Sequence, residues 1–160
     1  MEQLRKTYTR RAPLIMVADD AEDAREMYGQ YLALRGYRVV TAADGADAVD
    51  RARTCRPDII LMDLMMPRLD GWEAIRQLKG DPRTASIPVV AVSAHTHAAA
   101  RSEARSAGAD ACLTKPCLPP QLVLLVRALL SYRDAGLPVK TSDCVAFPNP
   151  MTGVSQKLEP

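Results

Sequence analysis

Polar side chains stand at the ends of several apolar runs in this sequence: Asp19, Asp20, Asp63, Ser93 and Lys115. Three carboxylates held close together repel one another, and either a divalent cation or protonation must relieve that repulsion. Oxygen ligands with retained waters suit Mg²⁺. A lysine and a hydroxyl beside them suit a phosphoryl group, whose oxygens need a cation and a hydrogen-bond donor. These residue types predict phosphoryl transfer, with an aspartate as the nucleophile that becomes a transient acyl phosphate.

Asp63 is the most informative of these residues. The run before it, 59–62, is unbroken and apolar, as a strand covered on both faces by helices requires. Pro67 and Gly71 then turn the chain away. Open α/β sheets place their chemistry beyond the carboxyl ends of the strands. Taken singly, Asp63 could be a helix cap or a structural ion-pair residue and Ser93 a helix N-cap, so the combination carries the interpretation.

The elements that must position these residues alternate regularly. Apolar runs predict strands at 14–18, 37–41, 59–63, 87–92 and 109–113. Helical spacing predicts helices at 24–34, 46–55, 72–79, 96–107 and 118–132, the first carrying apolar residues at Ala24, Met27, Tyr31, Leu32 and Leu34. Strands separated by such helices imply right-handed crossovers. The predicted fold is a doubly wound α/β sandwich: a five-stranded parallel sheet with helices on both faces.

Composition sets the outer limits. A chain of 160 residues with 25% charged and 48% apolar types is long enough for one buried core. We expect a basic N-terminal tail at 1–13, one domain at 14–133, and a proline-containing tail without a fold of its own at 134–160. The net charge of +2 does not argue for nucleic acid. The sequence shows neither a signal peptide nor a run of membrane-spanning length, so a cytoplasmic protein without a membrane partner is expected.

The cysteines carry no metal pattern. Cys55, Cys112, Cys117 and Cys144 form no CxxC pair and match no zinc spacing, so reduced thiols are expected. Cys112 and Cys117 flank Lys115 and could form a redox pair, although buried inert thiols are the favoured interpretation.

At this point the sequence resembles the response-regulator receiver domains of two-component signalling, in particular the stand-alone CheY-like type. The resemblance covers roughly 14–133. It rests on residues that occur in order at predicted strand ends: Asp19-Asp20, Asp63 within Asp-Leu-Met-Met-Pro, the trailing Asp70-Gly71, Ser93-Ala94 and Lys115-Pro116.

The resemblance implies a flavodoxin-like fold with strand order 2-1-3-4-5 and a role for each site residue. Asp63 would accept a phosphoryl group from a histidine kinase or phosphotransfer protein. Asp20, Asp63 and the backbone carbonyl of Met65 would ligate Mg²⁺, with Asp19 acting through water. Lys115 and Ser93 would contact the phosphoryl oxygens, and the Lys115–Pro116 peptide bond would be cis.

One position departs from the family pattern. The family usually carries Tyr or Phe three residues before the lysine, and its ring swings inward as the hydroxyl residue moves. Here that position is Cys112, so rotation of a ring cannot report the state of Asp63. The alternative function is therefore a receiver-like protein-binding module that acts independently of phosphorylation.

Partners follow from the same resemblance. We expect a signalling protein rather than an enzyme, with a downstream protein partner bound through the last strand and its flanking helices, a surface that could also pair two copies of the chain. An aspartate-nucleophile phosphatase would need an acid where Met65 stands, and a flavin carrier would need a phosphate loop where the first acids stand. His95 and His97, two residues apart, would not share a face of a helix, so surface positions are expected rather than a metal site. We hypothesise that His95 affects dephosphorylation.

Overall fold

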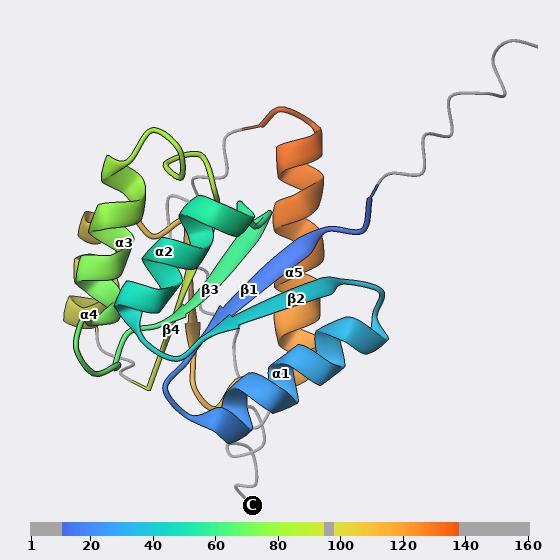
Figure 1. Cartoon of the computed structure of the whole chain (residues 1–160), viewed down its shortest axis with the longest axis horizontal. Coiled ribbons are helices and arrows are strands. Elements are labelled where there is room, and N and C mark those ends of the chain that lie inside the picture. The colour runs from blue at the N-terminus through green and yellow to red at the C-terminus, as the bar shows by residue number, and fades with distance from the viewer. Residues whose placement is uncertain (1–10, 95–97, 138–160) are drawn as a thin grey trace, which may run out of the picture.

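The computed structural model describes residues 11–94 and 98–137 of the chain. Within them, strands and helices alternate (Figure 1). The strands are β1 (Leu14–Ala18), β2 (Arg38–Ala42), β3 (Ile59–Asp63), β4 (Val89–Ser93) and β5 (Ala111–Thr114). The helices are α1 (Glu22–Leu34), α2 (Gly45–Cys55), α3 (Gly71–Gly80), α4 (Ala98–Ala107) and α5 (Pro119–Asp134).

The strands form one parallel sheet in the order β2-β1-β3-β4-β5. This confirms the expected flavodoxin-like order. Register pairs Asp63 with Val92 and Ser93 with Thr114. Because all strands run in one direction, the residues that follow β1, β3, β4 and β5 gather at one edge of the sheet.

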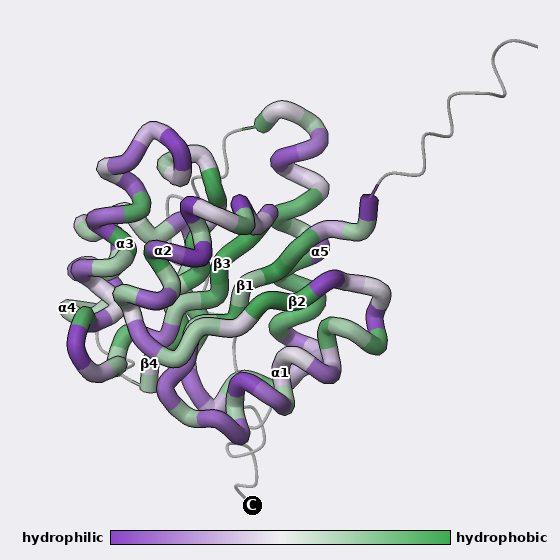
Figure 2. Tube along the Cα trace, in the orientation of Figure 1, coloured by the Kyte–Doolittle hydropathy of each residue, from purple (hydrophilic) through white to green (hydrophobic). Residues whose placement is uncertain are grey.

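Two apolar cores hold the helices against the sheet. Helices α2, α3 and α4 pack on one face, over side chains such as Met16, Ile60 and Met62. Helices α1 and α5 pack on the other, over Ile15 and Leu61. Figure 1 shows the sheet between these two groups of helices, and Figure 2 shows β1 and β3 as hydrophobic along most of their length. Burial on both faces explains their unbroken apolar sequences.

Most predicted boundaries agree with the structure within two residues. The strand β4 begins at Val89 rather than Ile87, because Pro88 has no backbone N–H to donate to the sheet. Helix α3 starts at Gly71, where Asp70 caps it by accepting a hydrogen bond from the Glu73 amide at 2.9 Å. The predicted start of α4 at Thr96 lies outside the described residues, as do His95 and His97.

The apolar residues that predict α1 do not all lie on its buried face. Of the apolar residues expected along that helix, Met27 and Leu34 are exposed, by 47% and 84% respectively. The buried positions are Leu32, which belongs to that set, and Tyr28, which does not. The apolar stripe of α5, by contrast, is buried as expected at Leu122, Leu125, Val126, Leu129 and Leu130.

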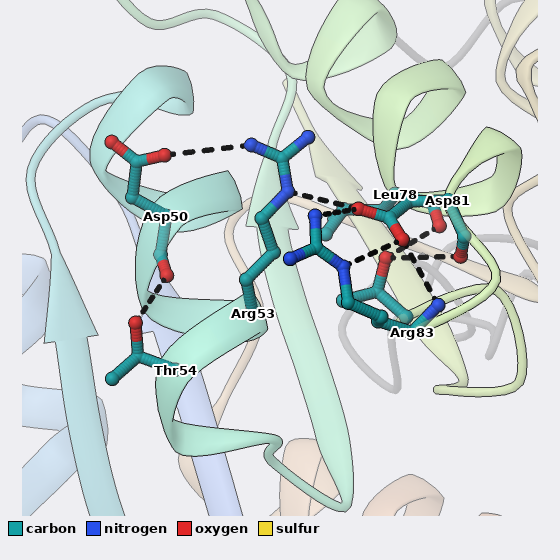
Figure 3. A network of polar contacts seen from close by, with 7 residues as sticks. Asp50, Arg53, Thr54, Leu78, Asp81 and Arg83 are labelled. Carbon is teal, nitrogen blue, oxygen red and sulfur yellow. Dashed lines mark hydrogen bonds and ion pairs between the residues drawn. The ribbon is translucent and has the colours of Figure 1, made fainter.

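A polar network joins α2 to the loop after α3 (Figure 3). Arg53 on α2 donates from Nε to Asp81 at 2.9 Å, and Arg83 donates to the same carboxylate at 2.8 Å. The hydrogen bonds from Arg83 hold the pKa of Asp81 far below its ordinary value. Thr84, fully buried, donates to the carbonyl of Leu78 at 2.7 Å. These contacts fix the end of α3 opposite the strand ends that carry the acids.

The proposed limits of the domain and its two tails stay predictions, because most of 1–13 and 134–160 falls outside the described residues. Among the helices the structure describes, none is both long and apolar enough to cross a membrane.

Candidate functional site

The strand ends bring three carboxylates together. Asp19 and Asp20 follow β1 and Asp63 ends β3, and one oxygen from each lies within 4.8 Å of the others. Asp19 and Asp63 are almost entirely buried, at 3% and 5% exposure, whereas Asp20 faces solvent. Such a set of hard oxygen donors, open on one side, fits a Mg²⁺ ion that keeps several of its waters.

Lys115, which follows β5, completes the cluster. Its Nζ lies 2.8 Å from Oδ2 of Asp19 and 3.4 Å from Oδ2 of Asp63. The Lys115 amide donates to the carbonyl of Ser93 at 2.8 Å, and the Lys115–Pro116 peptide bond is cis, as expected. The ammonium therefore stands between two buried carboxylates, where it offsets part of their repulsion.

Burial and charge shift the pKa values of these groups. Burial raises the pKa of Asp63, and the negative charge of Asp19 raises it further, against the lowering effects of the Met65 amide and Lys115. For Lys115, burial alone would lower the pKa, but the hydrogen bond to Asp19 and the charge of Asp63 outweigh it, so its pKa is raised. Lys115 stays protonated, and Asp63 holds its negative charge in a setting that disfavours it.

The loops at the site are held by their own backbone. Asp63 accepts a hydrogen bond from the Met65 amide at 3.2 Å, and Asp19 accepts one from the Ala21 amide at 2.9 Å. Gly71 packs directly against the main chain of the site, since a Cβ there would lie 2.2 Å from the carbonyl oxygen of Asp63. The Asp-Gly pair that ends the loop is thus a packing requirement as well as a turn.

Ser93 lies beside the acids on the neighbouring strand. It is buried and lines a cavity together with Cys112 of β5 and Ala100, Arg101 and Ala104 of α4. The cavity has room for little more than one water molecule. Cys112 stands at the sequence position where the family usually has an aromatic ring, and it lines this cavity with Ser93 and Arg101.

The cysteines differ from expectation at one position. Cys55 and Cys117 are free, whereas Cys112 is disulfide-bonded. The expectation of a reduced thiol was therefore wrong at Cys112, and the structure does not pair it with Cys117. Burial raises the pKa of Cys117 to about 11, in keeping with an unreactive thiol.

Two residues at the site were not predicted. Arg25 on α1 donates from Nη1 to the backbone carbonyls of Asp19 (2.8 Å) and Asp20 (3.1 Å). Tyr28, also on α1, donates its hydroxyl to the carbonyl of Cys117 at 3.0 Å. Both contacts use backbone carbonyls, which no pattern of side chains in the sequence reveals.

The geometry agrees with comparison to known proteins. Residues 15–127 match the family model described as the response regulator receiver domain. The chain belongs to this receiver family. Response regulator MprA of Mycobacterium tuberculosis is 40% identical over 116 residues, which are 72% of this chain and 50% of that protein. MprA of Mycobacterium avium is 40% identical over 118 residues, with the same coverage. The chain thus spans about half the length of these curated relatives.

Solved receiver structures give the same fold. The chemotaxis response regulator CheY4 of Vibrio cholerae matches with a TM-score of 0.70 at 28% identity. The match covers 73% of this chain and 98% of the CheY4 chain. The receiver domain of a Pseudomonas aeruginosa sensor histidine kinase, solved with a magnesium ion in its active-site cleft, has a TM-score of 0.70 at 29% identity and covers 75% of this chain and 98% of its own. The acidic cluster of this chain therefore lies in the same fold as these solved receiver domains.

Proposed function

We propose that this receiver accepts a phosphoryl group on Asp63 from a histidine kinase or phosphotransfer protein, in a reaction that depends on Mg²⁺. The observation that carries the proposal is the position of the Lys115 ammonium, within 3.4 Å of Asp63 and 2.8 Å of Asp19. A lysine at this position can pair with the Asp63 carboxylate before transfer and with the phosphoryl group on Asp63 afterwards. A structural ion pair would not require two buried carboxylates beside an exposed third.

The reaction itself is a transfer between two nucleophiles. A carboxylate oxygen of Asp63 forms a bond to phosphorus as the bond from phosphorus to the donor nitrogen breaks. The electron pair leaves with that nitrogen, which takes up a proton, and Asp63 becomes an acyl phosphate. Lys115 would neutralise one phosphoryl oxygen, and Ser93 would donate a hydrogen bond to another.

All three acids would take part in holding the metal. Asp20 and Asp63, with the backbone carbonyl of Met65, would be direct ligands, and Asp19 would act through a water molecule. The ion would supply positive charge that neutralises the transferring oxygens. This assignment is supported by the carboxylate oxygens lying within 4.8 Å of one another and by the magnesium-bound neighbour from Pseudomonas aeruginosa.

Output would occur by protein binding rather than by catalysis on a further substrate. The partner would bind at β5 and its flanking helices α4 and α5, where Leu118 and Leu124 are exposed by 48% and 58%. The same surface could pair two copies of the chain. We infer a cytoplasmic signalling protein that is not an enzyme and binds neither nucleic acid nor membrane through these residues.

The test is intact-mass analysis after incubation with Mg²⁺ and phosphoramidate, a small donor with a phosphorus–nitrogen bond. We expect one phosphoryl group on the wild-type chain, and none on Asp63→Asn or in excess EDTA. Asp70→Asn is the matched control, because asparagine still caps α3 and the acidic cluster is untouched. Absence of labelling in the wild type, or equal labelling of Asp63→Asn, would contradict the proposal.

A second candidate is a protein-binding module that ignores phosphorylation. It is favoured by Cys112, because a cysteine at that position has no ring to rotate. The two candidates differ in one measurement, the affinity of a captured partner for the chain with and without beryllofluoride, which mimics the acyl phosphate. Equal affinities would favour the second candidate even if Asp63 is labelled.

A further inference from the structure

Tyr28 is the buried polar side chain of α1 that the proposed reaction does not use. Its ring is 7% exposed, and its hydroxyl donates to the carbonyl of Cys117 at 3.0 Å. This hydrogen bond is buried and joins residues 89 positions apart. It links the helix after β1 to the loop after β5, two segments that do not neighbour each other in the sheet.

The place where Tyr28 attaches is close to Lys115. Cys117 is two residues beyond the lysine, past the cis peptide bond to Pro116. The carbonyl that accepts the hydroxyl is therefore part of the short loop that sets where the Lys115 ammonium points. Burial raises the pKa of Tyr28, so its hydroxyl keeps its proton and remains a donor throughout the neutral range.

The Tyr28 ring also lies under the acids. It lines a small cavity together with Asp19, Asp63 and the apolar residues Val92 and Leu122. The side chain thus reaches from the underside of the carboxylates to the lysine loop. A residue that only filled the core would need no hydroxyl, and an unbonded hydroxyl there would cost free energy.

Helix α1 contacts both sides of the site through one face. Arg25 donates to the carbonyls of Asp19 and Asp20, on the loop that carries the acids. Tyr28, three residues later and so on the same face, donates to the loop that carries the lysine. The distance between the acids and Lys115 is therefore set in part by two side chains of a single helix.

We propose that Tyr28 is a positioning residue for phosphoryl transfer: by holding the Cys117 carbonyl, its hydroxyl keeps Lys115 within reach of Asp63. The inference rests on the proposed phosphorylation of Asp63 and adds to it the residue that orients the lysine. Among the described contacts, the Tyr28 hydroxyl bonds to the Cys117 carbonyl and to neither Asp19 nor Asp63. Its effect passes through the loop at 115–117.

The test is Tyr28→Phe, which keeps the ring and removes the hydroxyl. Three quantities are measured in the full chain: the rate of Asp63 labelling by phosphoramidate, the dissociation constant of Mg²⁺, and the thermal midpoint. We expect labelling to slow by about threefold to tenfold, the range that the net free energy of one hydrogen bond allows. The dissociation constant for Mg²⁺ should stay the same or fall, because the carboxylates and the Met65 carbonyl are not altered and a displaced Lys115 competes less for them.

Tyr31→Phe is the matched control. Tyr31 lies one turn further along α1, and its hydroxyl bonds only to the exposed Arg35 among the described contacts, at 2.7 Å. We expect all three quantities to match the wild type. If Tyr28→Phe is too unstable at room temperature, the same three quantities are measured at a lower temperature at which circular dichroism shows it folded.

The outcomes separate this inference from the proposed function. Slower labelling with Mg²⁺ binding that is unchanged or tighter supports the positioning role. Labelling at the wild-type rate, whatever the thermal midpoint, overturns it, and so does a parallel loss of labelling and Mg²⁺ binding, which would mean general loosening of the site. If the wild type itself is not labelled on Asp63, the proposed function fails instead.

Discussion

Lys115 and Asp19 form an ion pair, Nζ to Oδ2 at 2.8 Å, across strands that are not neighbours in the sheet. Strand β3 lies between β1 and β4, and it ends in Asp63, so this pair passes over the end of the strand that carries the proposed acceptor. The ammonium and a bound cation would draw on the same carboxylates. In the proposed reaction the lysine would therefore oppose metal binding before transfer and assist the phosphoryl group after it.

Replacing Lys115 by methionine should separate these two effects. Lys115→Met removes the competing positive charge, and we expect Mg²⁺ to bind at least about threefold more tightly. Labelling of Asp63 should nevertheless slow, because the phosphoryl oxygens lose their cation. Calorimetric titration with Mg²⁺ and intact-mass kinetics measure the two quantities. Lys79→Met is the control, since it removes the Lys79–Asp110 pair (2.7 Å) and leaves the site unchanged; weaker Mg²⁺ binding in Lys115→Met would contradict the expectation.

Neutralising Asp63 should stabilise the metal-free fold. Because folding raises the pKa of Asp63 above 3.8, its contribution to stability is fully present below that pH and is lost as pH rises through the folded-state value. In EDTA at pH 7 we expect Asp63→Asn to melt higher than the wild type by about 2–8 °C, the shift produced by ~1 kcal/mol. The difference should shrink as the pH falls toward 4. A constant difference across that range, measured by circular dichroism, would show that the charge of Asp63 is not its source.

Gly71 should not tolerate a side chain. A Cβ there would lie 2.2 Å from the carbonyl oxygen of Asp63 and 2.6 Å from Cα of Leu64. We expect Gly71→Ala to lower the free energy of unfolding by about 1–3 kcal/mol or more and to slow labelling, because the backbone of the acceptor must move. Gly80→Ala, at the other end of α3 with nothing within 4 Å, should be neutral or slightly stabilising. Urea denaturation of the two variants makes the comparison, and equal losses would argue against the close approach.

Thiol reactivity should distinguish Cys55 from Cys117, the two free cysteines in the part of the chain that the structure describes. At pH 8 a thiol with a pKa of about 11 is only about 0.1% thiolate, and Cys117 is also buried, whereas Cys55 is exposed. We expect iodoacetamide to modify Cys55 in the native protein while Cys117 reacts at least about 100-fold more slowly. Tandem mass spectrometry locates the label. Cys55→Ser should remove it and Cys117→Ser should not; rapid native labelling of Cys117 would show that the loop after β5 opens.

The acids and the lysine could be predicted from the sequence because each follows an apolar run, and the ends of parallel strands must meet. These residues could therefore be assigned to one site although they are far apart in the sequence. Tyr28 was missed for the opposite reason. The buried stripe of α1 is set by how the helix lies on the sheet and α5, and Met27 and Leu34, apolar but exposed, obscured it. A hydroxyl that bonds to a distant backbone carbonyl leaves no pattern of residue types.

The close contact at Gly71 also determines which parts of the receiver can move separately. Gly71 packs on the main chain of Asp63, and its amide donates to the carbonyl of Leu64 at 3.1 Å. Any displacement of the acceptor backbone therefore carries the first turn of α3 with it. Strand β3 and that turn therefore move together, and the other end of α3 is fixed to α2 through Arg53 and Asp81. On the opposite flank of Asp63, by contrast, Ser93 borders a small cavity that Cys112 and Arg101 also line.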